Sequence, residues 1–500
     1  MTNNQLPEET QSFWMETGKR NKYSELEKNL DIDTVVIGGG IAGILTMYSL
    51  TKQGKDVALL EGRELLSGTT GYTTAKLSAQ HQLIYDELIN RYGEEHAQLF
   101  YQSNIEGIAY IKEIIEEHQI SCQINEQNAF VYTQDPAQKE NIKKEAEAYN
   151  KLNIPGRYLS ELPLDIDVEA AIQMDHQAEI QPVSFLHGVL EAVKQTNGHI
   201  YEHSLVNELT QNEDKTIHLK TSNGCEVTCN NAIFTTHYPT FEPDKFFTQM
   251  KPEISYALAY KTNKEYLDGM YINNDKPKRT FRKMSDGQDH YLLVGGQSHS
   301  IGDEHSEMSR YEEIDQFAKR TFGVGQASYR WSSHDLLTKD RIPFIGQLHP
   351  DYPNIYTATG FNKWGLAEAA TAARVLTDFI FNKQNRYTDM YHPRRNIPKL
   401  TEPSEKSSEP NDAKELIIPE TAEDIGINEA AVIKTEDEHT GIYKDKKGKL
   451  HYLDLSCTHL GCGLSWNNGD KTWDCPCHGS RFNAIGEVIE GPALIDLKQK

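Results

Sequence analysis

The chain has 500 residues, of which 74 are acidic and 51 are basic, so its formal net charge is −23 with neutral histidines. This excess of acidic residues argues against nucleic acid as a partner, because binding to phosphate backbones requires a field of Lys and Arg. Hydrophobic residues make up 37% of the sequence, which excludes a disordered chain. At about 100–200 residues per domain, the length predicts two to four domains.

The sequence contains no predicted transmembrane segment. Its longest apolar runs, such as residues 33–45, are interrupted by glycine or charge before the roughly 18–20 apolar residues that a membrane span requires. The N-terminal arm, residues 1–30, is polar and acidic and lacks the apolar core of a signal peptide. We therefore expect a cytoplasmic protein.

The first clear motif is a β-α-β unit. A β-branched run at residues 34–37 ends in the glycine-rich sequence 38–43, and a helical pattern continues through Leu50. A second predicted strand, residues 56–60, closes on Glu61. The order strand, tight turn, helix, strand is typical of a nucleotide-binding fold.

Gly38, Gly40 and Gly43 have the spacing of a dinucleotide fingerprint. The first glycine makes the tight turn, the second lets the backbone approach a pyrophosphate, and the third lets the helix pack on the strand. The helix N-terminus attracts the negative charge, and Glu61 is placed to accept hydrogen bonds from a ribose. A structural turn without a ligand is the alternative.

The middle of the chain mixes two patterns. Residues 104–118 and 137–152 have helical spacing, whereas residues 129–132, 255–260 and 290–294 alternate as strands do. We interpret these segments as an antiparallel sheet inserted into the first domain.

Further on, a strand at residues 355–360 ends in a glycine turn, and residues 367–381 follow as a helix. This second strand and helix indicate a return to the nucleotide-binding fold. Residues 396–412 are rich in Pro, Ser and charge and are predicted to be a linker. The last segment, residues 413–500, has short strand-like runs separated by Gly and Asn turns, as in a small all-β domain.

Two short motifs near the C-terminus combine cysteine and histidine. Residues 457–462 and 475–480 each supply one cysteine and one histidine with metal-ligand spacing, plus one further cysteine. A structural zinc site is the alternative to an iron-sulfur centre. Zinc sites with two cysteines and two histidines, however, usually pair cysteine with cysteine and histidine with histidine.

Four ordered segments carry a resemblance to a known family. The glycine fingerprint, the loop 67–81, residues 340–346 and residues 354–366 together resemble the D-amino-acid-oxidase-like superfamily of FAD-dependent oxidoreductases. The resemblance covers residues 31–395. It implies an α/β FAD-binding Rossmann-like domain with an inserted antiparallel-sheet substrate domain (α+β).

The resemblance also implies FAD contacts beyond Gly38, Gly40, Gly43 and Glu61. They come from the loop after the second strand and from the late glycine turn: Thr69, Thr70, Gly71, Thr74, Gly360, Phe361, Lys363, Trp364 and Gly365. The helix after the late turn would direct its N-terminal amides and dipole at the flavin, stabilising the charge that reduction adds. A packed Trp364 and a solvated Lys363 are the alternatives for those two side chains.

The two C-terminal motifs resemble those of the Rieske [2Fe-2S] family over residues 413–497. By this resemblance, Cys457 and Cys475 hold one iron while His459 and His478 hold the other.

The remaining cysteines of the two motifs, Cys462 and Cys477, match a disulfide that braces the two loops in the respiratory subfamily. Their redox state stays open, because disulfides are uncommon in a reducing cytosol. Ser480 matches a hydroxyl that hydrogen-bonds the cluster in high-potential members.

Together the two resemblances predict an FAD-dependent oxidoreductase that oxidises a small donor, an amine or amino acid. Electrons would pass through the Rieske cluster to an external acceptor, either a protein or a small molecule. Two alternatives stay open: a flavin oxidase with an accessory Rieske domain, and an electron-transfer protein fed by a partner. Candidate substrate-site residues are His81, Arg282 and His299, with Arg282 as a clamp for a carboxylate.

Overall fold

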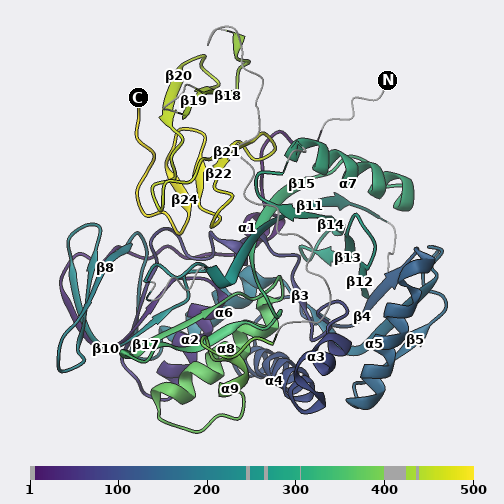
Figure 1. The fold of residues 1–500 in the computed structure, drawn as a ribbon, viewed down its shortest axis with the longest axis horizontal. Helices are drawn as coiled ribbons and strands as arrows, with labels where there is room; N and C mark the ends of the chain where they lie inside the picture. The colour runs from purple at the N-terminus through teal and green to yellow at the C-terminus, as the bar shows by residue number, and fades with distance from the viewer. Residues whose placement is uncertain are drawn as a thin grey trace.

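The computed structural model describes residues 6–241, 243, 248–263, 268–303, 306–398, 424–434 and 439–500. Figure 1 shows a large body built on two sheets, coloured purple to green, with the yellow C-terminal domain lying against it. The predicted linker, residues 396–412, lies outside the described residues from 399 onward. The boundary between the two domains therefore stays a prediction.

The first sheet contains the predicted β-α-β unit, in which α2 (Ile41–Lys52) connects two parallel strands. The strand order is β16-β17-β10-β1-β2-β7, and β8 and β9 extend it beside β10. Pairing is parallel from β17 to β7, and β16 is an antiparallel edge. The strands are β1 (Leu30–Ile37), β2 (Val57–Leu60), β7 (Gly198–Tyr201), β8 (Val206–Gln211), β9 (Ile217–Thr221), β10 (Glu226–Phe234), β16 (Phe344–His349) and β17 (Tyr352–Thr359).

The second sheet has the order β15-β11-β14-β13-β12-β4-β6-β3, with β5 beside β6. It is antiparallel as predicted except at one pair, because β4 and β12 run parallel. Between these two strands the chain forms four strands of the first sheet, β7 to β10. No hairpin therefore joins β4 to β12 and requires them to be antiparallel. The strands are β3 (Lys76–Leu77), β4 (Asn125–Thr133), β5 (Gly156–Leu159), β6 (Ala170–Glu179), β11 (Met250–Lys261), β12 (Met270–Asn273), β13 (Arg279–Ser285), β14 (His290–Ser300) and β15 (Tyr329–Thr338).

Four helices pack together beneath the first sheet, at the bottom of Figure 1: α2, α4, α6 and α8. Their apolar faces join the largest buried core of the molecule. In the described part of the chain, none of the helices combines the length and apolar content needed to cross a bilayer. Beyond α2, the helical segments are α1 (Phe13–Thr17), η1 (Thr69–Tyr72), α3 (Tyr85–Tyr92), α4 (Glu94–His118), η2 (Pro136–Gln138), α5 (Lys139–Lys151), α6 (Pro182–Val193), α7 (Glu307–Phe322), α8 (Gly365–Ile380) and α9 (Thr388–Tyr391).

The N-terminal segment packs against the large domain. The Ser12 hydroxyl caps α1 by accepting from the Trp14 backbone N–H, and Phe13 and Trp14 are buried. The Trp14 indole donates a 2.6 Å hydrogen bond to the carbonyl of Thr73. This short helix therefore braces the loop of residues 67–81, called the threonine-rich loop below. The polar composition of residues 1–30 did not indicate this role.

The C-terminal domain is all-β, as predicted, and consists of two small antiparallel sheets. Trp466 and Trp473 pack against each other in its core. The first sheet contains β18 (Glu429–Lys434), β19 (His439–Lys444) and β20 (Leu450–Asp454); the second contains β21 (Ser465–Asn467), β22 (Thr472–Asp474), β23 (Arg481–Asn483) and β24 (Val488–Glu490). The two Cys/His motifs occupy the loops β20–β21 and β22–β23.

Candidate functional site

The glycine turn has the geometry that its fingerprint predicts. Gly38 has a φ of +108°, a conformation that favours glycine. A Cβ on Gly43 would lie 2.0 Å from the Gly38 carbonyl oxygen, so only glycine lets α2 pack this closely. Gly40 is the N-cap of α2 and has no side chain to satisfy the first amides of the helix. The turn therefore leaves backbone donors available for an anionic ligand.

Glu61 closes the β-α-β unit. Its carboxylate accepts hydrogen bonds from the backbone N–H of Gly39, at 2.6 Å, and of Arg63, at 2.9 Å. These bonds fix the position of the carboxylate at the end of β2, beside the glycine turn. A ribose that binds as predicted would meet a carboxylate that the backbone already holds in place.

The threonine-rich loop lies directly over this turn. The Thr70 hydroxyl oxygen accepts a 3.1 Å hydrogen bond from the N–H of Ile41, so it caps the first turn of α2. Thr69 donates from its hydroxyl to the carbonyl of His334 in β15, at 2.9 Å. The loop thus connects the nucleotide turn to the second sheet.

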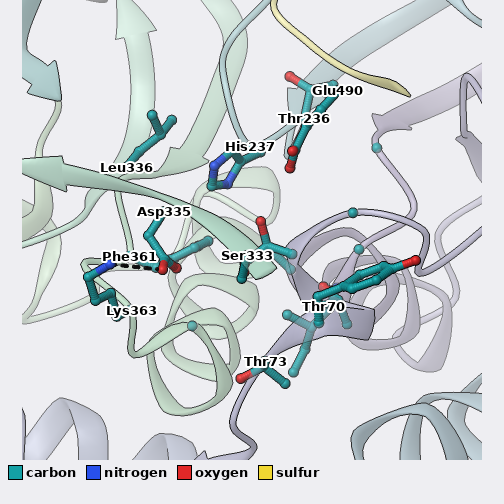
Figure 2. A pocket seen from close by; sticks show the side chains of 18 of the residues that line it. Thr70, Thr73, Thr236, His237, Ser333, Asp335, Leu336, Phe361, Lys363 and Glu490 are labelled. Carbon is teal, nitrogen blue, oxygen red and sulfur yellow. Dashed lines mark hydrogen bonds and ion pairs between the residues drawn. The ribbon is translucent and has the colours of Figure 1, made fainter. Parts of the chain in front are cut away.

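The late glycine turn leads into α8. The Lys363 ammonium lies 3.1 Å from the Asp335 carboxylate and 3.7 Å from that of Glu253, and Figure 2 shows the first of these ion pairs. The Trp364 ring stacks on His81 with centroids 4.8 Å apart and planes 9° apart. Lys363 is therefore ion-paired rather than solvated, and Trp364 is packed on one side while it lines the cavity described next.

A single cavity of about 770 Å³ joins these segments. It is lined by ten of the predicted FAD contacts: Gly38, Gly40, Glu61, Thr69, Thr70, Thr74, Phe361, Lys363, Trp364 and Gly365. The remaining three, Gly43, Gly71 and Gly360, lie behind the wall at positions where a Cβ would come within 2.0–2.5 Å of a neighbouring atom.

Two buried polar atoms in the cavity wall have no hydrogen-bond partner among the described residues. They are Nε2 of His237 and Oγ of Ser333, and Figure 2 shows both side chains from neighbouring parts of the wall. Buried polar groups are normally hydrogen-bonded, so these two indicate a polar ligand. The glycine turn, the N-terminus of α2 and this volume together fit a dinucleotide.

Arg282 does not act as the predicted carboxylate clamp in this structure. Its guanidinium is buried and pairs with Glu179 at 3.2 Å, and its Nε donates to the carbonyl of Thr74 at 2.8 Å. It is absent from the cavity lining, although Thr74 belongs to it. The spacing of the sequence could not show that a buried Glu179 already satisfies this cation.

His81 and His299 also lie outside the cavity lining. His81 is buried behind Trp364, and burial lowers its pKa to about 3, so it stays neutral at physiological pH. One His299 nitrogen lies 3.0 Å from the Tyr256 hydroxyl, and Tyr256 itself lines the cavity. Both histidines therefore support cavity residues from behind.

Lys76 is a cavity residue that the sequence did not single out. It is buried, and its ammonium donates to the carbonyl of Tyr271, at 3.0 Å, and to the hydroxyl of Thr280. Burial, with a smaller contribution from the nearby Arg282, lowers its pKa to about 7. The sequence feature that could have identified Lys76 is its position within the threonine-rich loop.

The two C-terminal loops are built alike. The Cys457 N–H donates to the carbonyl of Cys462 at 2.8 Å, and the Gly461 N–H returns to the Cys457 carbonyl at 2.8 Å. In the second loop, Cys475 and Gly479 make the corresponding bonds, of 2.8 Å to the Ser480 carbonyl and 3.0 Å to the Cys475 carbonyl. Two equivalent tight loops therefore face each other.

The four predicted ligands converge between these loops. Cys457 and Cys475 are buried, and their thiols are close enough to hydrogen-bond each other. The rings of His459 and His478 lie 5.1 Å apart and nearly perpendicular, at 88°. A pair of cysteine thiols and a pair of imidazoles are the donor types of a [2Fe-2S] centre with mixed ligation.

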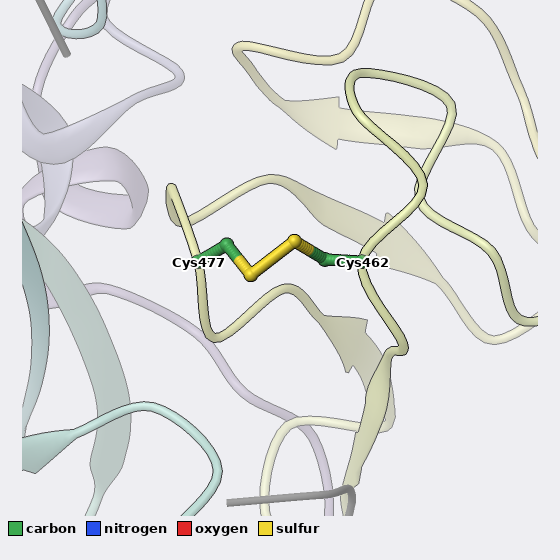
Figure 3. The surroundings of a disulfide bond; sticks show 2 residues. All are labelled: Cys462 and Cys477. Carbon is green, nitrogen blue, oxygen red and sulfur yellow. A yellow bond between two sulfur atoms is a disulfide. The ribbon is translucent and has the colours of Figure 1, made fainter. Parts of the chain in front are cut away.

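The predicted disulfide is present. Cys462 and Cys477 are bonded and join the two loops, as Figure 3 shows. Their sulfur atoms and that of Cys475 all lie within 4.8 Å of one another, so the disulfide directly borders the ligand set.

Ser480 is expected to set the potential of this centre. Its hydroxyl is buried, lies near the Cys457 sulfur and accepts from the Ala493 N–H at 3.0 Å. A hydrogen bond to a ligand sulfur stabilises the reduced, more negative centre. We expect Ser480→Ala to lower the midpoint potential by on the order of 50 mV, the equivalent of one hydrogen bond of about 1 kcal/mol. Potentiometric EPR measures this shift, and an unchanged or raised midpoint would contradict it.

The C-terminal domain also contributes to the cavity. Val488, Glu490, Gly491 and Ala493 line it together with the glycine turn and the threonine-rich loop. Figure 2 shows Glu490 above Thr236 and His237 on the same rim. The C-terminal domain therefore forms part of the wall of the predicted FAD cavity.

Comparisons with known proteins agree with this geometry. The chain matches a model of FAD-dependent oxidoreductases (DAO) over residues 33–379 and a model of the Rieske [2Fe-2S] domain over residues 418–499. It is 37% identical to the Bacillus subtilis protein YhfW, whose name describes a Rieske 2Fe-2S iron-sulfur protein, across 98% of each chain. It is 24% identical to gamma-glutamylputrescine oxidoreductase of Escherichia coli, across 76% of this chain and 91% of the relative.

A solved structure shares the fold. Glycine oxidase from Geobacillus kaustophilus superimposes with a TM-score of 0.63 at 15% identity, covering 74% of this chain and all of the other. At this identity the likeness supports the fold alone.

Proposed function

We propose that this chain, which belongs to the family of FAD-dependent oxidoreductases and carries a C-terminal Rieske [2Fe-2S] domain, oxidises a small amine or amino acid and delivers the electrons through its cluster to an external acceptor. FAD supplies two-electron oxidation of the donor, and the cluster supplies one-electron transfer. The protein supplies the placement of both groups, the donor pocket and the exclusion of water.

The observation that carries the proposal is the shared cavity. One wall holds the glycine turn and threonine-rich loop, and another holds Val488 and Glu490 of the Rieske domain. A Rieske domain that served only as an appendage would have no reason to close the flavin cavity. This arrangement favours electron delivery through the cluster over a flavin oxidase with an accessory domain.

Cations in one part of the cavity favour a donor that carries a carboxylate. Cations from the second sheet and its edges line it: Lys76, Lys278 and Arg279. Lys76 donates to oxygen atoms of Tyr271 and Thr280. Lys278 donates to oxygen atoms of Asn273 and Asn274. All four acceptors are neutral. A lysine with neutral partners that faces the cavity supports an amino acid as donor, with Lys278 orienting its carboxylate.

The test is an anaerobic panel of amines and amino acids added to the holoprotein. We expect an amino acid to bleach the flavin absorbance and a Rieske EPR signal to follow. Bleaching with stoichiometric peroxide in air and a silent cluster would instead establish a flavin oxidase. If no donor bleached the flavin but a partner reductase reduced the cofactors, the chain would instead be an electron carrier that receives its electrons from that partner.

Lys76 is expected to make flavin reduction pH-dependent. Below pH 7 its side chain is an ammonium; above about pH 7 it is a neutral amine that can accept the proton which a donor ammonium must lose. The rate of flavin reduction should therefore rise through pH 7 in the wild type. In Lys76→Met this step should be lost, as measured by stopped-flow bleaching across pH 5–9.

Lys283→Met is the matched control, because Lys283 lies on β13 but pairs with Asp268 at 2.7 Å and does not line the cavity. The control should keep the rise near pH 7. A Lys76→Met profile that superimposes on the wild-type profile would remove Lys76 from the proton step.

A further inference from the structure

The ligand loops of the Rieske domain press against the FAD-binding domain. A Cβ on Gly479, the residue after His478, would lie 3.1 Å from the Cβ of Pro252 in β11. One nitrogen of the buried His334 in β15 lies 3.3 Å from the Gly479 carbonyl oxygen. The second ligand loop is therefore held directly on the second sheet of the FAD-binding domain.

The turn between β21 and β22 fixes the same docking. The Asp470 carboxylate is 3% exposed and accepts hydrogen bonds from the hydroxyls of Tyr311, at 2.8 Å, and Ser332. Arg330 donates to the Gly469 carbonyl at 2.7 Å. Separating the domains would break these buried hydrogen bonds, so a fixed arrangement is favoured over a freely moving Rieske domain.

Tyr238 of the FAD-binding domain reaches both histidine ligands. Its ring centroid lies 6.1 Å from that of His459 and 5.8 Å from that of His478, at angles of 72° and 66°. These are edge-to-face contacts, and Tyr238 is 1% exposed. A single aromatic ring therefore covers the histidine end of the ligand set.

The neighbouring residue, His237, faces the cavity. It follows β10 with a φ of +63°, a conformation that non-glycine residues seldom adopt, and its carbonyl accepts a hydrogen bond from the Thr359 hydroxyl. His237 lines the cavity, as Figure 2 shows, while Tyr238 points at the ligand rings. One peptide bond thus separates the cavity wall from the contact with the cluster ligands.

We propose that Tyr238 is the contact through which electrons pass from the FAD site to the cluster, an inference that rests on the proposed function. Reduced FAD would supply one electron per transfer and the oxidised cluster would accept it. No bond would form between the two groups, and the flavin N–H proton would be lost to solvent as the flavin is oxidised. Electron tunnelling weakens steeply across gaps between groups, and the Tyr238 ring fills the space beside both imidazoles.

The test compares three variants of the holoprotein. Tyr238→Leu fills most of the space without a ring, and Tyr238→Phe keeps the ring without the hydroxyl. Phe241→Leu is the matched control, since it removes a ring that packs on Phe234 and Tyr352 of the same domain. Illumination with EDTA reduces the bound flavin in the absence of any donor, and the cluster is then followed by EPR and visible circular dichroism.

We expect Tyr238→Leu to slow the appearance of reduced cluster by about tenfold or more, because a packed contact is lost. Tyr238→Phe and Phe241→Leu should keep the wild-type rate. The g-values and midpoint potential of the cluster, and the small-angle scattering profile, should be unchanged in Tyr238→Leu. These readouts separate a role in transfer from a role in holding the domains or the ligands in place.

A Tyr238→Leu rate equal to that of the wild type would overturn the proposal, as would a slowed rate with a shifted midpoint or an expanded scattering profile. A wild-type protein whose photoreduced flavin never reduces the cluster would instead refute the proposed function. The two failures are therefore distinguishable.

Discussion

Cys475→Ser is expected to abolish the Rieske EPR signal while leaving FAD bound at its wild-type stoichiometry. Cys475 is fully buried at the centre of the facing loops and is predicted to hold one iron with Cys457. A hydroxyl is a poor substitute for a thiolate toward iron. The FAD cavity lies mainly in the other domain, so its cofactor should remain.

The kinetic consequence follows from the proposed order of electron flow. A donor should still bleach the flavin of Cys475→Ser, but reduction of a one-electron acceptor should fall by about 100-fold or more, since no cluster relays the electrons. Cys122→Ser is the matched control, because Cys122 is equally buried but lies in the FAD-binding domain, far from both motifs in sequence. An undiminished EPR signal in Cys475→Ser would contradict the ligand assignment.

Gly43→Val is expected to have the converse effect, with loss of FAD and retention of the cluster. A Cβ at this position would meet the Gly38 carbonyl oxygen at 2.0 Å and the Thr235 hydroxyl oxygen at 2.7 Å. Gly38 belongs to the turn that presents the backbone amides, and Thr235 follows β10 and hydrogen-bonds the Gly38 carbonyl, so relief of the clash must displace that turn. Bound FAD should fall to about a tenth of the wild-type stoichiometry or less.

Gly325→Ala is the control for this substitution. Gly325 is exposed and lies outside the cavity lining, and a Cβ there meets nothing within 4 Å. It should bind FAD as the wild type does. Absorbance of the released flavin and EPR of the cluster measure both cofactors in the same sample, and stoichiometric FAD in Gly43→Val would contradict the predicted role of the turn.

Local patterns in the sequence predict much of this fold. The β-α-β unit, the late strand and helix, and the all-β C-terminal domain follow from β-branched runs, glycine turns and helical spacing over a few residues. The family resemblances predict the two cofactors and the disulfide. The structure contains this disulfide, between Cys462 and Cys477.

Long-range pairing explains what local pattern could not predict. The parallel pairing of β4 with β12 depends on a chain path through the other sheet. The ion pair between Arg282 and Glu179 joins distant segments, so an arginine that looked available for a substrate is already satisfied. The positions of Lys76 and Tyr238 likewise depend on which segments the tertiary fold brings to the cavity and to the ligand loops.

Electron flow from the flavin to the cluster is the central claim, and a single anaerobic turnover tests it most directly. The oxidised holoprotein is mixed with a donor that bleaches its flavin, and samples are frozen at intervals for EPR. The account predicts that the Rieske signal grows as the fully reduced flavin declines. A flavin that stays fully reduced beside an oxidised, EPR-silent cluster would contradict it.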